Sequence, residues 1–324
     1  MGVWSYIAKR AALSTVVVLT VALLAFVLVR LAPGDPAELL AGEGASVEYV
    51  KMIKAEYGLD RPLTEQLAIY FRNLLMGNLG FSISFSRPVI DVIMERVPQT
   101  LLLAGTAIFF AVVIGIVLGI SAAKKPYSLR DGLINGVSLT LFSIPVFWLG
   151  MVLIFGLSLR VRLFPTGGLF DVGVESNLPN LMVNVGWHLV LPALTLCSYF
   201  LATYARLTRA GLLEALGMNY IVAARAKGVS EHDVLYRHAL RNALLPVITI
   251  AGIQIGLMVG GVVLTEGVFS WPGVGSLLIM AVSYRDYPLV TGIFLITAIS
   301  VAVSNLVVDM VYAMVDPRVR TGIA

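Results

Sequence analysis

The chain has 324 residues, of which 58% are hydrophobic and 13% are charged, and its mean hydropathy is +0.90. Soluble domains carry about 25% charged residues, so this composition excludes a disordered chain and argues against an ordinary soluble enzyme. The formal net charge is only +4, and the Lys and Arg residues lie between apolar blocks, unlike the basic face of a nucleic-acid-binding protein. Cys197, the single cysteine, excludes an internal disulfide, and we expect it to be a small buried side chain.

Six apolar segments are each long enough to cross a bilayer, which takes about 20 residues. In chain order they cover residues 11–29, 100–123, 132–159, 187–205, 243–265 and 288–308. The first has no clear A-x-A cleavage site, so we expect it to be retained and not removed as a signal peptide. The sequence therefore predicts an all-α polytopic membrane protein with six transmembrane helices.

Positive charge in the short connections predicts the orientation. If the N-terminus is cytoplasmic, the short connections place 13 Lys and Arg residues on the cytoplasmic side and 3 on the other, so both termini are predicted to be cytoplasmic. The remaining seven, Arg30 through Arg96, are not counted, because they lie in a segment too long for the rule. The chain then divides into a tail with the first helix (1–30), an external cap (31–99) and a core of five helices (100–324) that contains a cytoplasmic segment, 206–242. Within the cap, residues 47–57 and 63–75 are predicted to be amphipathic helices.

None of the six apolar segments contains Asp, Glu, Lys or Arg. Carriers coupled to ions usually keep such a group at the middle of the membrane, so we expect the energy for transport to come from outside this chain. The sequence also has no Gly-Lys pair to hold nucleotide phosphates and no cluster with metal-ligand spacing. We therefore predict no catalytic residue, no cofactor and no metal in this chain.

Four residues inside the spans are candidates for the solute pathway or for helix kinks: Pro145, Pro192, Gln254 and Asn305. A proline removes a backbone N–H and bends the helix, which serves packing more often than a pathway. For the two amides, a hydrogen bond between helices is the commoner role.

Glycines recur at four-residue spacing in two spans, at Gly115 and Gly119 and again at Gly252, Gly256 and Gly260. Small residues at this spacing let helix backbones approach closely. The contact could lie within this chain or against a second membrane subunit.

The segment between spans four and five reads as a rigid helical hairpin. Residues 220–227 form a short helix, Gly228 ends it in the left-handed conformation, and Ser230 caps a second helix that runs toward Pro246. Physical reasoning leaves two alternatives open for it, a docking part for another protein or an amphipathic hairpin lying on anionic lipid.

The hairpin resembles the coupling motif of ABC importer permeases, E-A-A, three residues, Gly, nine residues, I-x-L-P. Val222 replaces Glu, His238 replaces Ile and Arg241 replaces Pro, and these departures match the dipeptide and oligopeptide permease branch, in which A-R-A-K-G (224–228) and H-A-L-R-N-A-L-L-P (238–246) recur. Further segments typical of that branch lie at 32–36, 143–147, 164–168, 269–273, 285–288 and 316–318.

The resemblance implies a type I ABC importer permease fold in a prokaryotic cytoplasmic membrane. It implies the passage of peptides or similar small solutes, with oligosaccharides, nickel complexes or glutathione as alternative cargo, and it makes a secondary transporter or a scaffold the less favoured reading. The implied partners are a homologous second permease, two ATPase subunits that bind ATP and Mg²⁺, and an external substrate-binding protein that docks on the cap and on loop 166–186. The implied ATPase-coupling residues are Tyr220, Ala223, Ala224, Arg225, Ala226, Lys227, Gly228, His238 and Leu240.

Overall fold

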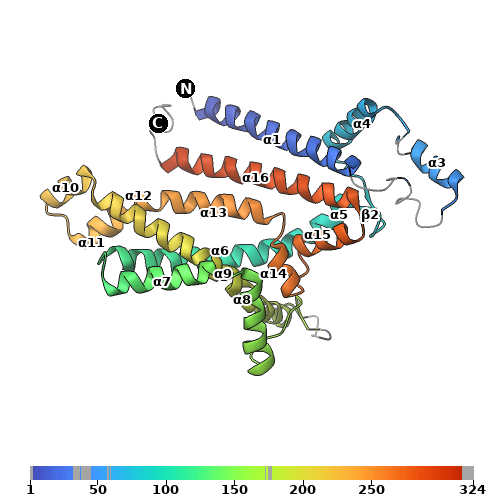
Figure 1. Ribbon diagram of the computed structural model, residues 1–324. Coiled ribbons are helices and arrows are strands. Elements are labelled where there is room, and N and C mark those ends of the chain that lie inside the picture. The colour runs from blue at the N-terminus through green and yellow to red at the C-terminus, as the bar shows by residue number, and fades with distance from the viewer. Residues whose placement is uncertain are drawn as a thin grey trace.

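The computed structural model describes residues 3–31, 37, 45–56, 58, 60–171, 173 and 177–315, and these form an elongated helical molecule (Figure 1). The predicted motif segments 32–36 and 316–318 lie outside the described residues. The first half holds α1 (Val3–Leu31), α3 (Val47–Glu56), α4 (Leu63–Leu75), β1 (Phe81–Ser82), β2 (Arg87–Pro88), α5 (Val89–Met94), α6 (Val97–Ala123), α7 (Leu129–Ser143), α8 (Val146–Leu153) and the π-helix η1 (Ile154–Arg160). The second half holds α9 (Leu178–Leu216), α10 (Asn219–Ala226), α11 (Glu231–Asp233), the π-helix η2 (Val234–Ala239), α12 (Leu240–Ala243), α13 (Leu245–Met258), α14 (Val263–Val268), α15 (Val274–Ser283) and α16 (Tyr287–Val315).

Four helical stretches are long and apolar enough to cross a membrane: 10–28 in α1, 89–123 across α5 and α6, α9, and 287–310 in α16. These confirm apolar helices at the first, second, fourth and sixth predicted spans. Two more stretches qualify only as bent pairs, α7 with α8–η1 and α11–α12 with α13, so the described residues hold four spans, or up to six if each bent pair is one span. The architecture is that of a multi-pass helical membrane protein.

The third predicted span is broken, with a bend of 95° between α7 and α8–η1. Ile144 adopts an extended conformation at the end of α7, and Pro145 precedes the first residue of α8. The residue before a proline is disfavoured in the helical region, and Pro145 has no N–H to continue the helix. The α8–η1 arm consequently projects away from the other long helices (Figure 1).

The fifth predicted span, 243–265, ends earlier than the hydropathy indicates, because α13 stops at Met258. Gly261 follows with φ +96°, a conformation that favours glycine, and a Cβ there would collide with the backbone of Gly275. The chain therefore folds back, and two short helices, α14 and α15, fill the distance to the start of α16.

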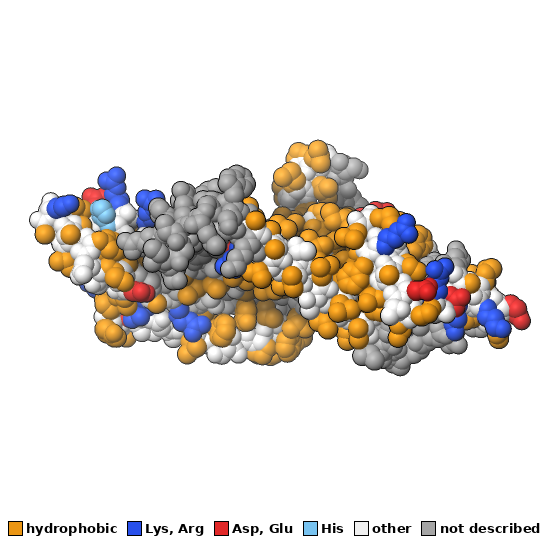
Figure 2. Space-filling model, turned by 90° about the horizontal axis from the view of Figure 1, so that it is seen from above, with side chains coloured by type: hydrophobic (Ala, Val, Ile, Leu, Met, Phe, Trp, Pro, Cys, Tyr) orange, Lys and Arg blue, Asp and Glu red, His pale blue; other side chains and the backbone are white. Residues whose placement is uncertain are grey.

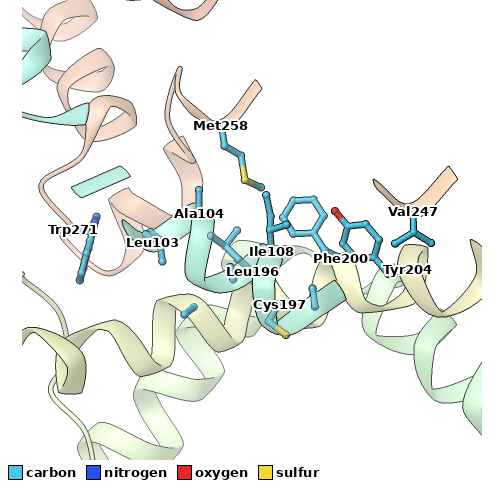
Figure 3. Packing of buried hydrophobic residues seen from close by; sticks show 13 residues of the cluster. Leu103, Ala104, Ile108, Leu196, Cys197, Phe200, Tyr204, Val247, Met258 and Trp271 are labelled. Carbon is cyan, nitrogen blue, oxygen red and sulfur yellow. The ribbon is translucent and has the colours of Figure 1, made fainter. Parts of the chain in front are cut away.

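The centre of the molecule is the α6–α9 pair, where glycine allows close contact. A Cβ on Gly115 would lie 2.6 Å from Cβ of Tyr204, and one on Gly119 would lie 2.7 Å from the carbonyl oxygen of Ala205. Around this contact, Leu103 and Ile108 of α6 pack with Leu196, Phe200 and other buried residues of α9, and Met258 of α13 covers them (Figure 3). Cys197 lies buried in this cluster, as predicted.

The other glycine series packs α13 against α16. A Cβ on Gly256 would lie 2.7 Å from Ser304, and Gly252 and Gly260 face Val308 and Thr297 of the same helix. Both glycine series therefore make contacts within this chain. The helix α1 lies outside α16, and Arg10 forms an ion pair with Asp309 at 3.2 Å.

Charge and hydrophobicity are distributed along the length of the molecule. In the view of Figure 2, charged side chains gather toward the two ends, and a hydrophobic belt covers the middle. One end carries α10 and α11, and the other carries α3 and α4 (Figure 1). A belt between two polar ends is the surface expected of a protein that crosses a bilayer.

Helices α3 and α4 lie where the sequence predicts amphipathic helices, although Tyr57 is outside the described residues. A two-stranded antiparallel hairpin, β1–β2, follows them and is attached to α16 by a buried carboxylate. Asp286 accepts hydrogen bonds from Ser82 Oγ at 2.5 Å and from the backbone N–H groups of Ser84 and Leu289 at 3.0 and 3.2 Å.

Candidate functional site

The hairpin 219–243 connects α9 to α13 and begins with α10, which ends in a Schellman motif. The N–H of Val229 donates to the carbonyl of Ala224 at 3.2 Å, and the N–H of Gly228 donates to the carbonyl of Arg225 at 2.9 Å. Gly228 has φ +77°, the left-handed conformation that its position predicts. A Cβ at Gly228 would have no neighbour within 4 Å, so only the backbone conformation favours glycine there.

Side chains close the turn on its polar side. Ser230 caps α11, since its Oγ accepts from the N–H of Asp233 at 3.2 Å and donates to the Asp233 carboxylate at 2.8 Å. Arg225 and Glu231 form a bidentate ion pair with distances of 2.8 and 3.1 Å. These hydrogen bonds lower the pKa of the Glu231 carboxyl and raise the pKa of the Arg225 guanidinium, so the pair stays charged at neutral pH.

The hairpin is held to the end of α9 by an apolar cluster. Ile221 and Ala224 of α10 are buried with Leu212 of α9 and with Val234 and Ala239 of η2. The amide of Asn242 also donates to the hydroxyl of Tyr220 at 2.9 Å. Because both arms share one core and one turn motif, the hairpin is packed as a single unit against the C-terminal part of α9.

The structure brings the predicted coupling residues together at this hairpin but gives them different surroundings. Ala224 is buried in the hairpin's own core, so it supports the fold, and Leu240 is half-buried. The exposed members are Tyr220, Ala223, Arg225, Ala226, Lys227, Gly228 and His238. They present small and basic side chains at the end of the molecule.

The four predicted pathway or kink residues do not form one site. Gln254 of α13 accepts a hydrogen bond from the Tyr204 hydroxyl, which joins α13 to α9. Asn305 is exposed on α16, and Pro192 is buried within a continuous α9. Only Pro145 lies at a break, and there it lines an open groove of about 650 Å³ with Leu139, Thr140, Ser143, Ile144 and Trp148.

Sequence reasoning missed a fully buried carboxylate, Glu266, which lies one residue beyond the fifth predicted span. Its Oε1 accepts from the Thr100 hydroxyl at 2.8 Å, and its Oε2 accepts from the N–H of Ser276 at 2.9 Å. The Thr100 hydroxyl also accepts from the N–H of Val274 at 2.8 Å. The carboxylate thus joins α6, α14 and the N-terminus of α15, where helix dipoles favour negative charge.

A second missed feature is the ion pair between Asp131 of α7 and Arg209 of α9. Two hydrogen bonds of 2.7 Å connect the groups in bidentate geometry, and Asp131 also accepts from Asn135. Hydropathy describes each segment separately, so it could not predict a contact between residues 78 positions apart. Within the described ranges, no three His, Cys, Asp or Glu side chains are grouped as a metal site.

The fold and the hairpin define a class of protein: a multi-pass helical membrane protein with a rigid polar hairpin at one end. Sequence comparison gives the particular family. Residues 115–321 match the binding-protein-dependent transport system inner membrane component, and residues 3–104 match the N-terminal region described for such membrane components. The chain belongs to this family of inner-membrane transport components.

The relatives that match almost end to end include two named permeases. The oligopeptide transport system permease protein AppB of Bacillus subtilis (strain 168) is 40% identical over 317 residues, which cover 98% of this chain and 99% of AppB. The dipeptide transport system permease protein DppB of Escherichia coli (strain K12) is 39% identical over 334 residues, which cover 97% of this chain and 98% of DppB.

Solved structures support the fold. A chain of the MetNI methionine ABC transporter has a TM-score of 0.53 at 20% identity, with 70% of this chain and 97% of that chain covered. A chain of an amino acid ABC transporter has a TM-score of 0.50 at 15% identity, with 71% and 94% covered. The helical arrangement is thus shared with chains of ABC transporters.

Proposed function

We propose that this chain is one of two membrane-spanning permease subunits of an ABC importer for short peptides. An external binding protein delivers the solute, and ATP hydrolysis in separate partner subunits drives its passage. The observation that carries the proposal is the rigid hairpin at one end of the molecule, which has the small, glycine-terminated helix of a coupling element. The near full-length identity of 39–40% to permeases named for dipeptides and oligopeptides supports peptide as the cargo.

In the proposed topology there are six spans, of which α7 with α8–η1 forms the third and α13 the fifth, and both termini and the hairpin 219–243 are cytoplasmic. The excess of Lys and Arg in the connections on the hairpin side supports this orientation. The start of α1 and the end of α16 lie together, as the ion pair between Arg10 and Asp309 indicates. The cap 31–99 and loop 166–186 then face the external binding protein.

The proposed mechanism follows from the way in which the hairpin is attached. The exposed face of α10, with Tyr220, Ala223, Ala226, Lys227 and Gly228, seats in a groove of an ATPase subunit. Ala223 and Ala226 present little side-chain bulk, so a partner surface can approach the helix backbone closely. Closure of the ATPase pair pulls the hairpin, and α9 follows because Ile221 and Leu212 share one buried cluster. No residue of this chain takes part in the hydrolysis.

The coupling role is tested by two substitutions at one position. Gly228→Val places a β-branched residue in the left-handed conformation, which it strongly disfavours, whereas Gly228→Asn places a residue that tolerates it. We expect the valine variant to hydrolyse ATP with at least a severalfold loss of peptide uptake per ATP, and the asparagine variant to remain coupled. The assay is simultaneous ATPase and uptake measurement on the complete complex in proteoliposomes. Coupled uptake by the valine variant would contradict the seating of α10.

Assembly and cargo are tested separately. The tagged chain isolated in mild detergent should copurify with an ATPase and a second permease subunit. Its cognate binding protein should then carry a short peptide, identified by mass spectrometry of the ligand released on denaturation. Recovery of an oligosaccharide, a nickel complex or glutathione would leave the proposed importer function standing but would contradict peptide as its cargo.

A further inference from the structure

Arg206 and Arg209 lie three residues apart on α9, but only Arg209 forms an ion pair within the described residues. Arg209 is neutralised by the bidentate ion pair with Asp131. Arg206 is exposed, its Nε donates to the carbonyl of Ala202 at 3.2 Å, and no ion pair to it occurs among the described residues. Arg206 follows directly on the fourth predicted span, 187–205, and an arginine at the end of a span commonly extends toward the membrane surface.

The direction of the Arg206 side chain is informative. Its guanidinium carbon lies 5.3 Å from the centre of the Phe142 ring, and Phe142 stacks on Tyr199 at 5.3 Å with 18° between the rings. The hydrogen bond to Ala202 shows that the side chain runs toward the N-terminus of α9, into the apolar span and away from the hairpin. An arginine that reaches for lipid headgroups on the hairpin side would extend in the opposite direction.

Phe142 is next in the chain to Ser143, one of the residues that line the open groove at the α7–α8 break. Phe142 lies on α7 between the groove residues Thr140 and Ser143, and Trp148 on α8 is exposed at the other side of the break. Non-helical backbone in a membrane span is stable only where it is covered by protein or lines a water-filled cavity. Since Pro145 leaves the carbonyl of Leu141 without a helical donor, this place requires a polar or solvated environment.

We propose that Arg206, with Phe142 and Tyr199 as its platform, forms a solute-binding site that holds the carboxylate of a peptide in transit. This inference rests on the proposed function and extends it to a site within this chain. A guanidinium binds a carboxylate through two parallel N–H···O hydrogen bonds. The Phe142 ring restrains the guanidinium plane and offers an apolar contact to the solute. A single cation over an exposed aromatic pair binds weakly enough to release the solute onward.

The test compares two cargoes in the complete importer, reconstituted with saturating loaded binding protein. The cargoes are one peptide sequence with a free carboxylate and with a C-terminal amide, chosen so that the wild-type complex takes up both. The ratio of variant to wild-type rate is measured for each cargo, which cancels the preference of the binding protein. We expect Arg206→Gln to lower the maximal rate about tenfold for the free acid and less than about twofold for the amide.

Two further variants separate charge from geometry and from general damage. Arg206→Lys keeps the charge but loses the bidentate hydrogen-bond geometry of the guanidinium, so its rate for the free acid should fall between those of wild type and Arg206→Gln. Arg160→Gln is the matched control, because that guanidinium lies 5.4 Å from the Phe155 ring on the α8–η1 arm. It should slow neither cargo.

Equal slowing of both cargoes by Arg206→Gln, or no slowing of either, would overturn the proposal. Equal slowing would assign Arg206 to lipid or to the partner permease. If the wild-type complex shows no ATP-dependent peptide uptake, the proposed function fails instead, which is a different result.

A second measurement leaves Arg206 unsubstituted, so it tests the proposed carboxylate site even if Arg206→Gln does not assemble. Ser143→Cys in a Cys197→Ser chain gives the subunit one cysteine in the groove. An anionic methanethiosulfonate should modify it faster than a cationic one, and the free-acid peptide, but not its amide, should slow the modification. Absence of both effects would overturn the proposal.

Discussion

Glu266 is a buried carboxylate that is compensated by hydrogen-bond donors, and within the described chain no cation forms an ion pair with it. Both of its oxygens accept, so the site needs an acceptor at each position. Glu266→Gln keeps the shape but turns one acceptor into a donor, which would face the backbone N–H of Val262 at the Oε1 position or that of Ser276 at the Oε2 position. We expect this variant to lose about 1–3 kcal/mol of unfolding free energy, seen as a lower Tm in detergent.

The exposed pair Arg61–Glu65, at 3.9 Å, supplies the control for this substitution. Glu65→Gln should leave the Tm within the range of a surface change, since exposed ion pairs contribute little. An unchanged Tm in Glu266→Gln would show that the α6–α14–α15 junction does not depend on the second acceptor.

Close approach of α6 and α9 gives a second expectation for single residues. Gly119→Ala puts a methyl group 2.5 Å from Cβ of Thr208 and 2.7 Å from a backbone oxygen, so the helices must separate, at a cost of about 1–3 kcal/mol. Gly105, on the same helix, has no neighbour within 4 Å of a Cβ, and Gly105→Ala should be neutral or stabilising. Thermal unfolding of both variants in the same detergent measures the difference. Equal Tm values would refute the close contact.

At the scale of elements, the hairpin depends on its apolar core more than on its ion pair. Ile221 is fully buried, whereas its neighbour Val222 is 58% exposed on the same helix. We expect Ile221→Ala to lower the local stability of 219–243 by about 2–4 kcal/mol. Hydrogen exchange of this segment, followed by mass spectrometry, should therefore accelerate in Ile221→Ala and stay unchanged in Val222→Ala.

Exchange at the wild-type rate in Ile221→Ala would mean that the turn motif and the Arg225–Glu231 pair hold the hairpin without its core. The physical reasons against this are that the pair is exposed and that exposed pairs contribute at most about 1 kcal/mol.

The elements also show which features a sequence can predict. Hydropathy locates α1, α6, α9 and α16 because each is a continuous apolar helix, and local signals locate Gly228 and the Ser230 cap because both act within a few residues. The 95° break at Pro145 combines the proline with an extended Ile144, and the end of α13 depends on the contact between Gly261 and Gly275. The burial of Glu266 could not be predicted, because its partners Thr100 and Ser276 lie on other helices.

At the scale of the whole molecule, the apolar belt and the two polar ends define an axis across the bilayer (Figure 2). The hairpin lies at one end of this axis, and the α3–α4 cap lies at the other (Figure 1). We therefore expect the two ends to face opposite compartments. Moving the hairpin to the outer side would also place most of the basic connections there, against the usual charge bias.

This polarity is tested by labelling single cysteines in intact cells. In a Cys197→Ser chain, Met76→Cys lies at the exposed end of α4, and Lys227→Cys lies at the exposed end of the hairpin. A membrane-impermeant maleimide applied to spheroplasts should label Met76→Cys and spare Lys227→Cys, and permeabilisation should expose both. Labelling of Lys227→Cys in sealed spheroplasts would place the hairpin outside, where ATP-driven subunits could not reach it. The orientation and the coupling role would then fail together, because a hairpin that shares a core with α9 transmits force only from the side on which its partner lies.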